Sequence, residues 1–104
     1  MIKAKFQKSR GKLCGFSVNG HSGYADAGAD IVCASVSSAV MLTANALTEV
    51  FNVVNTEVSA EDDTVSVKIG ESRDGQMLIE ALLLHLNALS EDYPENISVK
   101  ISEV

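Results

Sequence analysis

The sequence contains few cysteines, few basic residues and no long apolar run. Its 104 residues include two cysteines and eight lysines and arginines. It has no stretch of about eighteen apolar residues, the length at which a membrane helix is suspected. Two cysteines are too few for a disulfide framework, and residues 1–5 lack the apolar segment of a secretory signal. These absences predict a cytoplasmic protein that does not enter a membrane and whose thiols stay reduced.

The overall composition is that of a compact folded domain. Apolar residues make up 46% of the chain and charged residues 21%, with a mean hydropathy of +0.15. A chain of this size can bury roughly two-thirds of its unfolded surface, which is enough for a core without disulfide or metal support. The sequence contains no linker or internal repeat, so residues 1–104 are predicted to form a single domain.

The few basic residues are concentrated at one end of the chain. The formal net charge is -6, yet the first twelve residues carry five of the eight cations and no acid. These cations are Lys3, Lys5, Lys8, Arg10 and Lys12. The acidic remainder favours basic partners and disfavours direct binding of nucleic acid or anionic membranes. The basic segment itself is either the solvated face of a hairpin or a patch that contacts RNA.

The first part of the chain has the pattern of a β-hairpin followed by a loop. Apolar residues alternate over residues 2–6, residues 9–11 form a turn, and residues 13–18 are a second extended run. Residues 19–29 then contain three glycines and no apolar period, which predicts a loop. The Asn-Gly pair at its start is also compatible with a tight hairpin turn.

A long helix is predicted next, with Asp30 as its N-cap and Ile31–Val50 as its body. Its buried stripe is predicted to contain Val32, Val36, Val40, Thr43, Leu47 and Val50. Glu49 is the only charged residue between Ile31 and Val50. A helix with one wet side normally carries a charged face, so this helix is predicted to be covered on two sides, the second by another copy of the protein.

The second half of the chain continues with alternating strand and helix patterns. These predict a strand over 51–58, an acidic turn at 61–63, a strand over 64–69, a helix over 74–90 and a strand over 97–104. Asp74 is the predicted cap of this second helix, and Pro94 follows its end. The order ββαββαβ predicts an α/β (α+β) two-layer sandwich with a mostly antiparallel sheet and both helices on one face.

The strongest chemical signal is a cysteine near a predicted helix start. With Asp30 as N-cap, Cys33 is the third helical residue, where unpaired amides and the helix dipole stabilise a thiolate, although the cap carboxylate opposes them. The nearest imidazole in sequence is His21, and a loop returning to a helix start can bring the two groups together. Cys33 and His21 are therefore a candidate nucleophile and base. The alternative is that Cys33 is a small buried apolar residue.

Other chemistry finds less support in the residue pattern. The glycine-bearing loop lacks the GxGxxG and GxxxxGK[ST] motifs and has no lysine near the helix start, which argues against a nucleotide site. His21, Cys33 and Asp26 lack the paired spacing of zinc ligands, so no metal or other cofactor is predicted. Cys14, in the middle of a strand, is predicted to be a core residue, and His85, in an apolar helix, is predicted to be a packing or interface residue.

Residues 20–37, GHSGYADAGADIVCASVS, resemble the signature of the ribosomal-processing cysteine protease family, also called Prp or YsxB-like. The shared features are Gly-His, Gly-Tyr, Asp-Ile-Val-Cys after a glycine, and a serine four positions after the cysteine. Ser22 and Ser35 stand where the family often has alanine. Chain length and element order also agree. The resemblance implies an enzyme that removes the N-terminal extension of a large-subunit ribosomal protein, and it implies a homodimer.

The resemblance also implies roles for individual residues. Cys33 and His21 match the family's catalytic dyad, and Asp30 and Ser37 fall on its supporting positions. The first-turn amides near Cys33 are predicted to stabilise the oxyanion. The loop is predicted to order around an extended substrate peptide through Gly20, Gly23, Tyr24 and Gly28.

Two rival functions follow from the same residues. In the first, the chain is a non-catalytic, dimeric ribosome-associated module that binds RNA through its basic N-terminal hairpin. In the second, it is a thiol-redox protein, which requires Cys14 to lie within disulfide distance of Cys33.

Overall fold

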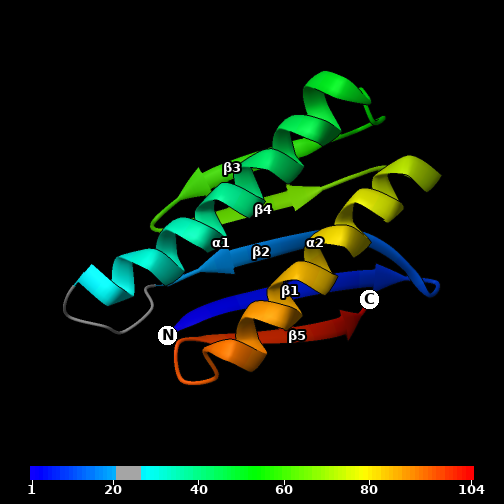
Figure 1. Ribbon diagram of the computed structural model, residues 1–104. Coiled ribbons are helices and arrows are strands. Elements are labelled where there is room, and N and C mark those ends of the chain that lie inside the picture. The colour runs from blue at the N-terminus through cyan, green and yellow to red at the C-terminus, as the bar shows by residue number, and fades with distance from the viewer. Residues whose placement is uncertain (21–26) are drawn as a thin grey trace.

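The computed structural model describes residues 1–20 and 27–104, and the side chains of residues 27–30 lie outside that description. It contains a five-stranded sheet and two long helices, the first of which continues into a π-helical turn (Figure 1). In chain order the elements are β1 (Ile2–Ser9), β2 (Lys12–Asn19), α1 (Ala27–Asn45), η1 (Ala46–Val50), β3 (Glu57–Glu61), β4 (Thr64–Lys68), α2 (Arg73–Asp92) and β5 (Ile97–Glu103).

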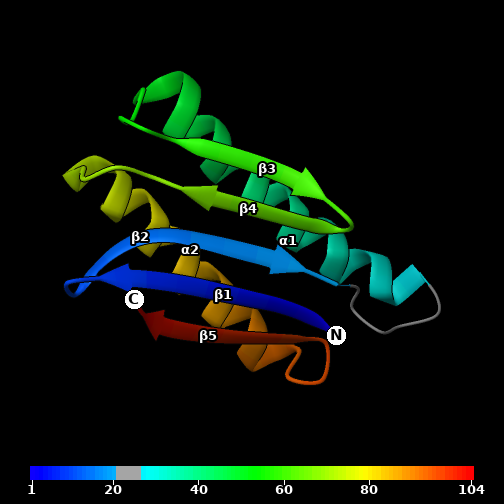
Figure 2. The same ribbon diagram turned by 180° about the vertical axis from the view of Figure 1, so that it is seen from behind.

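The sheet has the strand order β3-β4-β2-β1-β5, and both helices cover the same face of it (Figures 1 and 2). The β1–β5 pair is parallel, whereas β1–β2, β2–β4 and β3–β4 are antiparallel. The predicted α/β two-layer sandwich of order ββαββαβ, mostly antiparallel and with both helices on one face, is confirmed.

The opening hairpin forms as its residue pattern predicts. Ile2, Ala4 and Phe6 alternate with exposed residues and point toward the helices, where each is buried. Arg10 and Gly11 both have positive φ, of 55° and 76°, and close the tight turn into β2. Across the two strands the rings of Phe6 and Phe16 lie 5.8 Å apart between centroids. The hairpin thus supplies the centre of the core.

The core lies between this sheet and the two helices. Helix α2 contributes Ile79, Leu82 and Leu86, which are almost fully buried. Over residues 31–50, where the structure describes the side chains, the buried residues of α1 and η1 are Val32, Val36, Val40, Thr43 and Leu47. These positions confirm the predicted stripe except at Val50, which is 70% exposed. Truncating a fully buried leucine such as Leu86 to alanine removes about 2–5 kcal/mol of stability, so this layer fixes the position of both helices.

Helix α1 and η1 have an apolar outer surface despite their polar residues. The hydroxyls of Ser35, Thr43 and Thr48 donate to the carbonyl oxygens four residues earlier in the helix, at 2.8–2.9 Å. Among the described residues, the structure contains one helical segment, Ile31–Val50, that is long enough and apolar enough to cross a membrane by length and composition alone. Its mean hydropathy is 1.6, and 22% of it is buried. In the fold this segment packs on the sheet as half of the helical layer.

The start of α1 differs from the prediction in a way that affects the site. The helix begins at Ala27, so the predicted loop over 19–29 is too long, and Gly28 is helical. Asp30 is the fourth helical residue and not the N-cap, and Cys33 is the seventh and not the third. Alanine is the strongest helix former, which accounts for a helix that extends back to Ala27, and an acidic residue is favourable in a first turn as well as at a cap.

Two further boundaries were predicted wrongly. Residues 51–58 are not one strand, because β3 begins only at Glu57. Asn52 and Asn55 have φ of 47° and 55°, the left-handed conformation that asparagine tolerates and an extended strand excludes. Helix α2 is capped by Ser72, whose hydroxyl accepts the Gly75 amide at 3.0 Å, and not by Asp74.

Candidate active site

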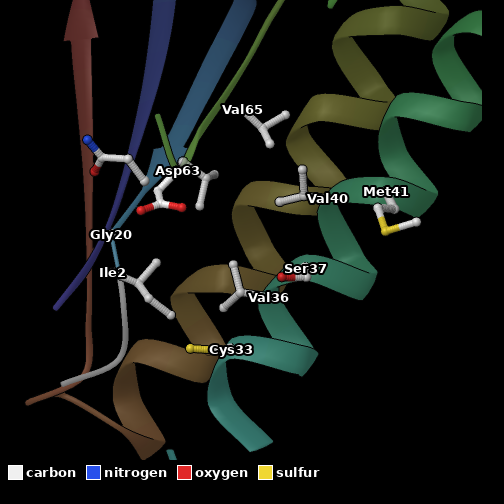
Figure 3. Close-up of a pocket in the computed structure, with 11 residues that line it drawn as sticks. Ile2, Gly20, Cys33, Val36, Ser37, Val40, Met41, Asp63 and Val65 are labelled. Atoms are coloured by element: carbon white, nitrogen blue, oxygen red, sulfur yellow. The ribbon is translucent and has the colours of Figure 1, made fainter. Parts of the chain in front are cut away.

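Cys33 lies half-buried at the wall of a cavity between α1 and the end of the sheet. Helix α1 contributes Cys33, Val36, Ser37 and Val40, which share one helical face because they are three, four and seven residues apart. The cavity has a volume of about 230 Å³. Met41 of α1 also lines it, and the sheet side is formed by Ile2, Val18, Asn19, Gly20, Asp63 and Val65. Figure 3 shows the Cys33 thiol and the Val36 side chain pointing from α1 toward Ile2 at the start of β1.

The opposite wall depends on Gly20, which follows the last residue of β2. Its φ is +93°, a conformation that other residues rarely adopt. A Cβ atom at this position would lie 2.5 Å from the carbonyl oxygen of Met1. Glycine therefore allows the chain to leave β2 against the N-terminal strand and reach the cavity that contains Cys33. His21 is the next residue in the chain.

The turn between β3 and β4 also reaches this site. Asn19 pairs with Thr64 across β2 and β4, which brings the preceding Asp63 beside Gly20. A second cavity of about 390 Å³ shares Gly20, Cys33, Ser37, Asp63 and Val65 with the first and extends along Ala60, Glu61, Asp62 and Thr64. Figure 3 shows the Asp63 carboxylate on the sheet side of the site, across from α1.

Sequence reasoning missed Asp63 as a site residue, because it treated residues 61–63 only as an acidic turn. Asp62 and Asp63 both have positive φ, at 51° and 63°, so they form the tight turn of a hairpin. An Asp-Asp pair between two extended runs is a signal for such a turn. Its position beside Gly20 depends on the β2–β4 register, which only the folded chain establishes.

The site combines a mostly apolar wall with polar groups from both α1 and the sheet. Ile2, Val18, Val36, Val40 and Val65 provide most of the wall, and Asn19, Ser37 and Asp63 provide amide, hydroxyl and carboxylate groups. Such a cavity can hold an apolar side chain while polar groups contact a peptide backbone, and a thiol is a group that can act as a nucleophile. The arrangement is suited to covalent chemistry on a peptide.

The structure brings together some of the predicted site residues and does not describe others. Cys33, Ser37 and Gly20 share one cavity. His21, Gly23 and Tyr24 lie outside the described residues, as does the side chain of Asp30, so their roles stay predictions. Gly28 lies in α1 and not in the predicted loop.

The predicted oxyanion donors do not have the assumed geometry. Cys33 is the seventh residue of α1, and only the first four amides of an α-helix lack a partner within the helix. The amide of Cys33 is therefore an interior helical amide, and the prediction that first-turn amides lie at this cysteine is wrong. For the same reason, the helix dipole acts on the thiol from one turn further away than predicted.

The other cysteine is in a different environment. The Cys14 thiol donates to the carbonyl oxygen of Gln7 at 3.5 Å, and both cysteines are free. Cys14 lies five residues before Asn19 in β2, about 17 Å along the strand, whereas Asn19 lines the Cys33 cavity. Disulfide formation needs Cα atoms within about 7 Å. The thiol-redox alternative is therefore excluded by geometry.

Two further groups can be placed. His85, predicted to be a packing or interface residue, is exposed and lines a separate cavity between α1 and α2 with Ala39, Leu42 and Leu82. Among residues 1–20 and 27–104, no group of three or more His, Cys, Asp or Glu side chains is placed to hold a metal ion.

Comparison with known proteins gives a consistent result over nearly the whole chain. A family model described as cysteine protease Prp matches residues 1–98. The ribosomal processing cysteine protease Prp of Bacillus subtilis (strain 168) is 28% identical over 107 aligned positions, which cover 95% of this chain and 96% of that protein.

Solved structures match the fold equally well. The crystal structure of SMU.848 from Streptococcus mutans is 32% identical and has a TM-score of 0.85, covering 100% of this chain and 96% of that one. An essential ribosomal processing protease Prp from S. aureus, solved with a covalently linked product peptide, is 22% identical and has a TM-score of 0.87. That match covers 98% of this chain and 100% of the S. aureus chain.

Proposed function

This chain belongs to the Prp family of cysteine proteases, and from that premise we propose that it removes the N-terminal extension of a large-subunit ribosomal protein. Cys33 is the nucleophile and His21 the general base and acid. The observation that carries the proposal is the shared cavity of Cys33 and Gly20, the residue directly before His21. The name of the Bacillus subtilis relative, a ribosomal processing protease, supports the choice of substrate.

The proposed reaction proceeds through a thioester. His21 takes the proton from the Cys33 thiol, and the thiolate attacks the carbonyl carbon of the scissile peptide bond. The C–N bond then breaks, and the leaving amine takes the proton from His21. His21 then takes a proton from a water molecule, whose oxygen attacks the thioester carbon. The C–S bond breaks, the protonated His21 returns its proton to the Cys33 sulfur, and the new carboxylic acid loses its proton to solvent. No metal or cofactor takes part in these steps.

Ser37 is proposed to bind the substrate beside the reacting bond. It lies one helical turn after Cys33 and lines the same cavity, so its hydroxyl can donate to a carbonyl oxygen of the peptide. Gly20, Gly23 and Tyr24 are proposed to contact the extended peptide on the other side. Asp30 is proposed to support the dyad.

The charge of the chain is compatible with the proposed substrate. With a net charge of -6 and carboxylates at Glu61, Asp62 and Asp63 along the second cavity, the site attracts a basic peptide. Ribosomal proteins are commonly basic because they bind RNA, and the proposed compartment, the cytoplasm, is where bacterial ribosomes assemble.

A homodimer is part of the proposal. Apolar side chains on the outer surface of the first helix are exposed, including Met41 at 63% and Leu42 at 72%. Exposed apolar area of this kind on a helix with one charged residue is typical of an interface, and a second copy of the chain is its proposed occupant. Sedimentation at micromolar concentration tests this, with a dimer expected. A monomer would contradict the proposed assembly.

The experiment that tests the protease proposal is cleavage of a peptide that spans the extension junction of the ribosomal protein. The wild-type chain is expected to cut it at one bond, and Cys33→Ala to lose at least about a thousandfold in rate. A peptide with the same residues in scrambled order controls for unspecific proteolysis. Equal rates for wild type and Cys33→Ala would overturn the proposal.

A further inference from the structure

The outer face of the sheet, which no helix covers in Figure 2, carries a local excess of positive charge in an acidic protein. Ile2, Ala4 and Phe6 of β1 are buried against the helices, so the intervening Lys3 and Lys5 point to the opposite face. Both lysines are exposed. The basic residues of the N-terminal segment are thus divided between the two faces of the sheet, because Lys8 and Lys12 line a cavity on the helical side with residues of α2.

The sheet register adds a third lysine from the far end of the chain. Lys5 pairs with Lys100 across the parallel β1–β5 ladder, and Lys3 pairs with Ser98. Neighbouring strands lie about 4.8 Å apart and alternate residues of a strand about 7 Å apart, so the three lysines start from adjacent positions. We call Lys3, Lys5 and Lys100 the lysine face. Like charges directly opposite each other destabilise a sheet, so this arrangement favours an anionic partner.

The protein does not neutralise the lysine face within its described residues. Among residues 1–20 and 27–104, the ion pair present joins Lys12 to Glu71 at 3.3 Å and includes none of the three lysines. The outward positions around them on β1, β2 and β5 are Gln7, Gly15, Ser17, Asn19, Ser98 and Ser102, none of which is acidic. The outward acids of the sheet, Glu57 and Glu61, lie on β3, three strands from β1.

We propose that the lysine face binds the phosphate backbone of double-stranded RNA. Lysine ammonium groups together with serine hydroxyls are typical phosphate contacts. The outward positions of β1, β2 and β5 hold no aromatic ring on which unpaired bases stack, and no large apolar side chain that enters a lipid layer. The choice of RNA over DNA rests on the proposed function, since a ribosomal protein substrate assembles on RNA.

The proposed RNA surface leaves the candidate active site open. Cys33 and Ser37 belong to α1, which covers one face of the sheet in Figure 2, and the lysine face is on the opposite face. Asn19 is an outward residue of β2 that pairs with Lys3 and also lines the Cys33 cavity, so the two surfaces meet there. RNA on the lysine face therefore holds the enzyme beside its substrate without blocking the thiol.

The test measures binding to an RNA duplex of about 20 base pairs by fluorescence anisotropy between about 50 and 200 mM salt. The protein carries Cys33→Ala, so that RNA binding is measured independently of the proposed nucleophile. The test variant adds Lys3→Gln, Lys5→Gln and Lys100→Gln. A matched control instead adds Lys8→Gln, Lys12→Gln and Arg73→Gln, which removes the same charge from the helical side. Circular dichroism verifies that both variants fold.

The lysine-face variant is expected to bind at least about tenfold more weakly at low salt. The slope of log binding constant against log salt concentration is expected to become less steep by about two to three. The matched control is expected to stay within about threefold of its parent. Equal losses in both variants, or none in either, would overturn the proposal. Equal binding of a DNA duplex of the same sequence, or stronger lysine-dependent binding of anionic vesicles, would overturn the assignment to RNA.

Peptide cleavage separates this proposal from the proposed function. With Cys33 restored, the lysine-face variant is expected to cut the junction peptide at the wild-type rate, since none of its three lysines lines the Cys33 cavity. Loss of RNA binding with full cleavage supports the lysine face. Failure of the unmodified enzyme to cut the peptide counts against the protease proposal, because the binding measurement does not depend on hydrolysis.

Discussion

The two ends of β2 have the same kinds of residue in different surroundings. Each end has a glycine with positive φ, Gly11 before the strand and Gly20 after it, and each has a cysteine nearby. A Cβ atom at Gly11 meets nothing within 4 Å, whereas one at Gly20 meets the Met1 carbonyl oxygen at 2.5 Å. Residue type alone therefore does not distinguish the two ends of β2. The close packing around Gly20, which Gly11 lacks, does distinguish them.

The two cysteines, like the two glycines, differ in their surroundings. Cys14 is the additional residue of a bulge, since Gln7 pairs with Gly15 and Lys8 with Leu13, and its thiol donates to a backbone carbonyl. Cys33 projects from a helix into a cavity lined by three strands and a turn. One end of β2 is a structural turn, and the other borders the cavity that contains Cys33, the proposed nucleophile.

The largest expected effect within this comparison comes from the glycines. Gly20→Ala is expected to lower kcat/KM for the junction peptide about a hundredfold, because displacing the chain before His21 misaligns the dyad. Gly11→Ala is the matched control. It is expected to lose only the roughly 1–2 kcal/mol cost of a left-handed alanine and no activity. Equal activity of the two variants would break the distinction between the two ends.

The second effect concerns thiol reactivity. In Cys14→Ala and Cys33→Ala, each of which retains one thiol, alkylation by iodoacetamide at neutral pH is expected to be about tenfold faster at Cys33. The physical reason is that Cys33 lies at the wall of a cavity, where the proposed base His21 is expected to take its proton, whereas the Cys14 thiol donates a hydrogen bond to a backbone carbonyl inside the sheet. Equal alkylation rates would argue that Cys33 is not activated.

The smallest effect concerns two adjacent serines of α1. Ser37 lines the Cys33 cavity, whereas Ser38 lines the separate cavity between α1 and α2. Ser37→Ala is expected to lower kcat/KM about fivefold, the value of one hydrogen bond of about 1 kcal/mol to the substrate. Ser38→Ala is expected to leave it unchanged. A larger loss of kcat/KM in Ser38→Ala than in Ser37→Ala would indicate that the substrate binds on the other side of the helix.

The sequence predicted the elements better than their boundaries. Strong periodicity identified β1, β2 and both helices, because burial on one face imposes a regular pattern. The start of α1 was misplaced since Asp30 is equally acceptable as a cap and inside a first turn. The strand predicted over 51–58 failed because Asn52 and Asn55 adopt left-handed conformations, which interrupt an otherwise apolar run.

The site was predictable where residues are close in sequence and not where they are distant. Cys33 and Ser37 share a helical face at any helix start, so their proximity followed from spacing alone. Asp63 required the pairing of β4 with β2, and the lysine face required the parallel pairing of β5 with β1. These contacts join segments that are more than forty residues apart, and local patterns do not contain that information.

The central claim is that the Cys33 sulfur forms a covalent bond to the substrate. The most direct measurement is mass spectrometry of the enzyme quenched in acid during cleavage of the junction peptide, followed by digestion to locate the added mass. The account predicts an increase equal to the acyl part of the N-terminal product, located on Cys33. An acyl group on another residue would contradict it. Cleavage that shows no adduct and continues at the full rate in Cys33→Ala would also contradict it.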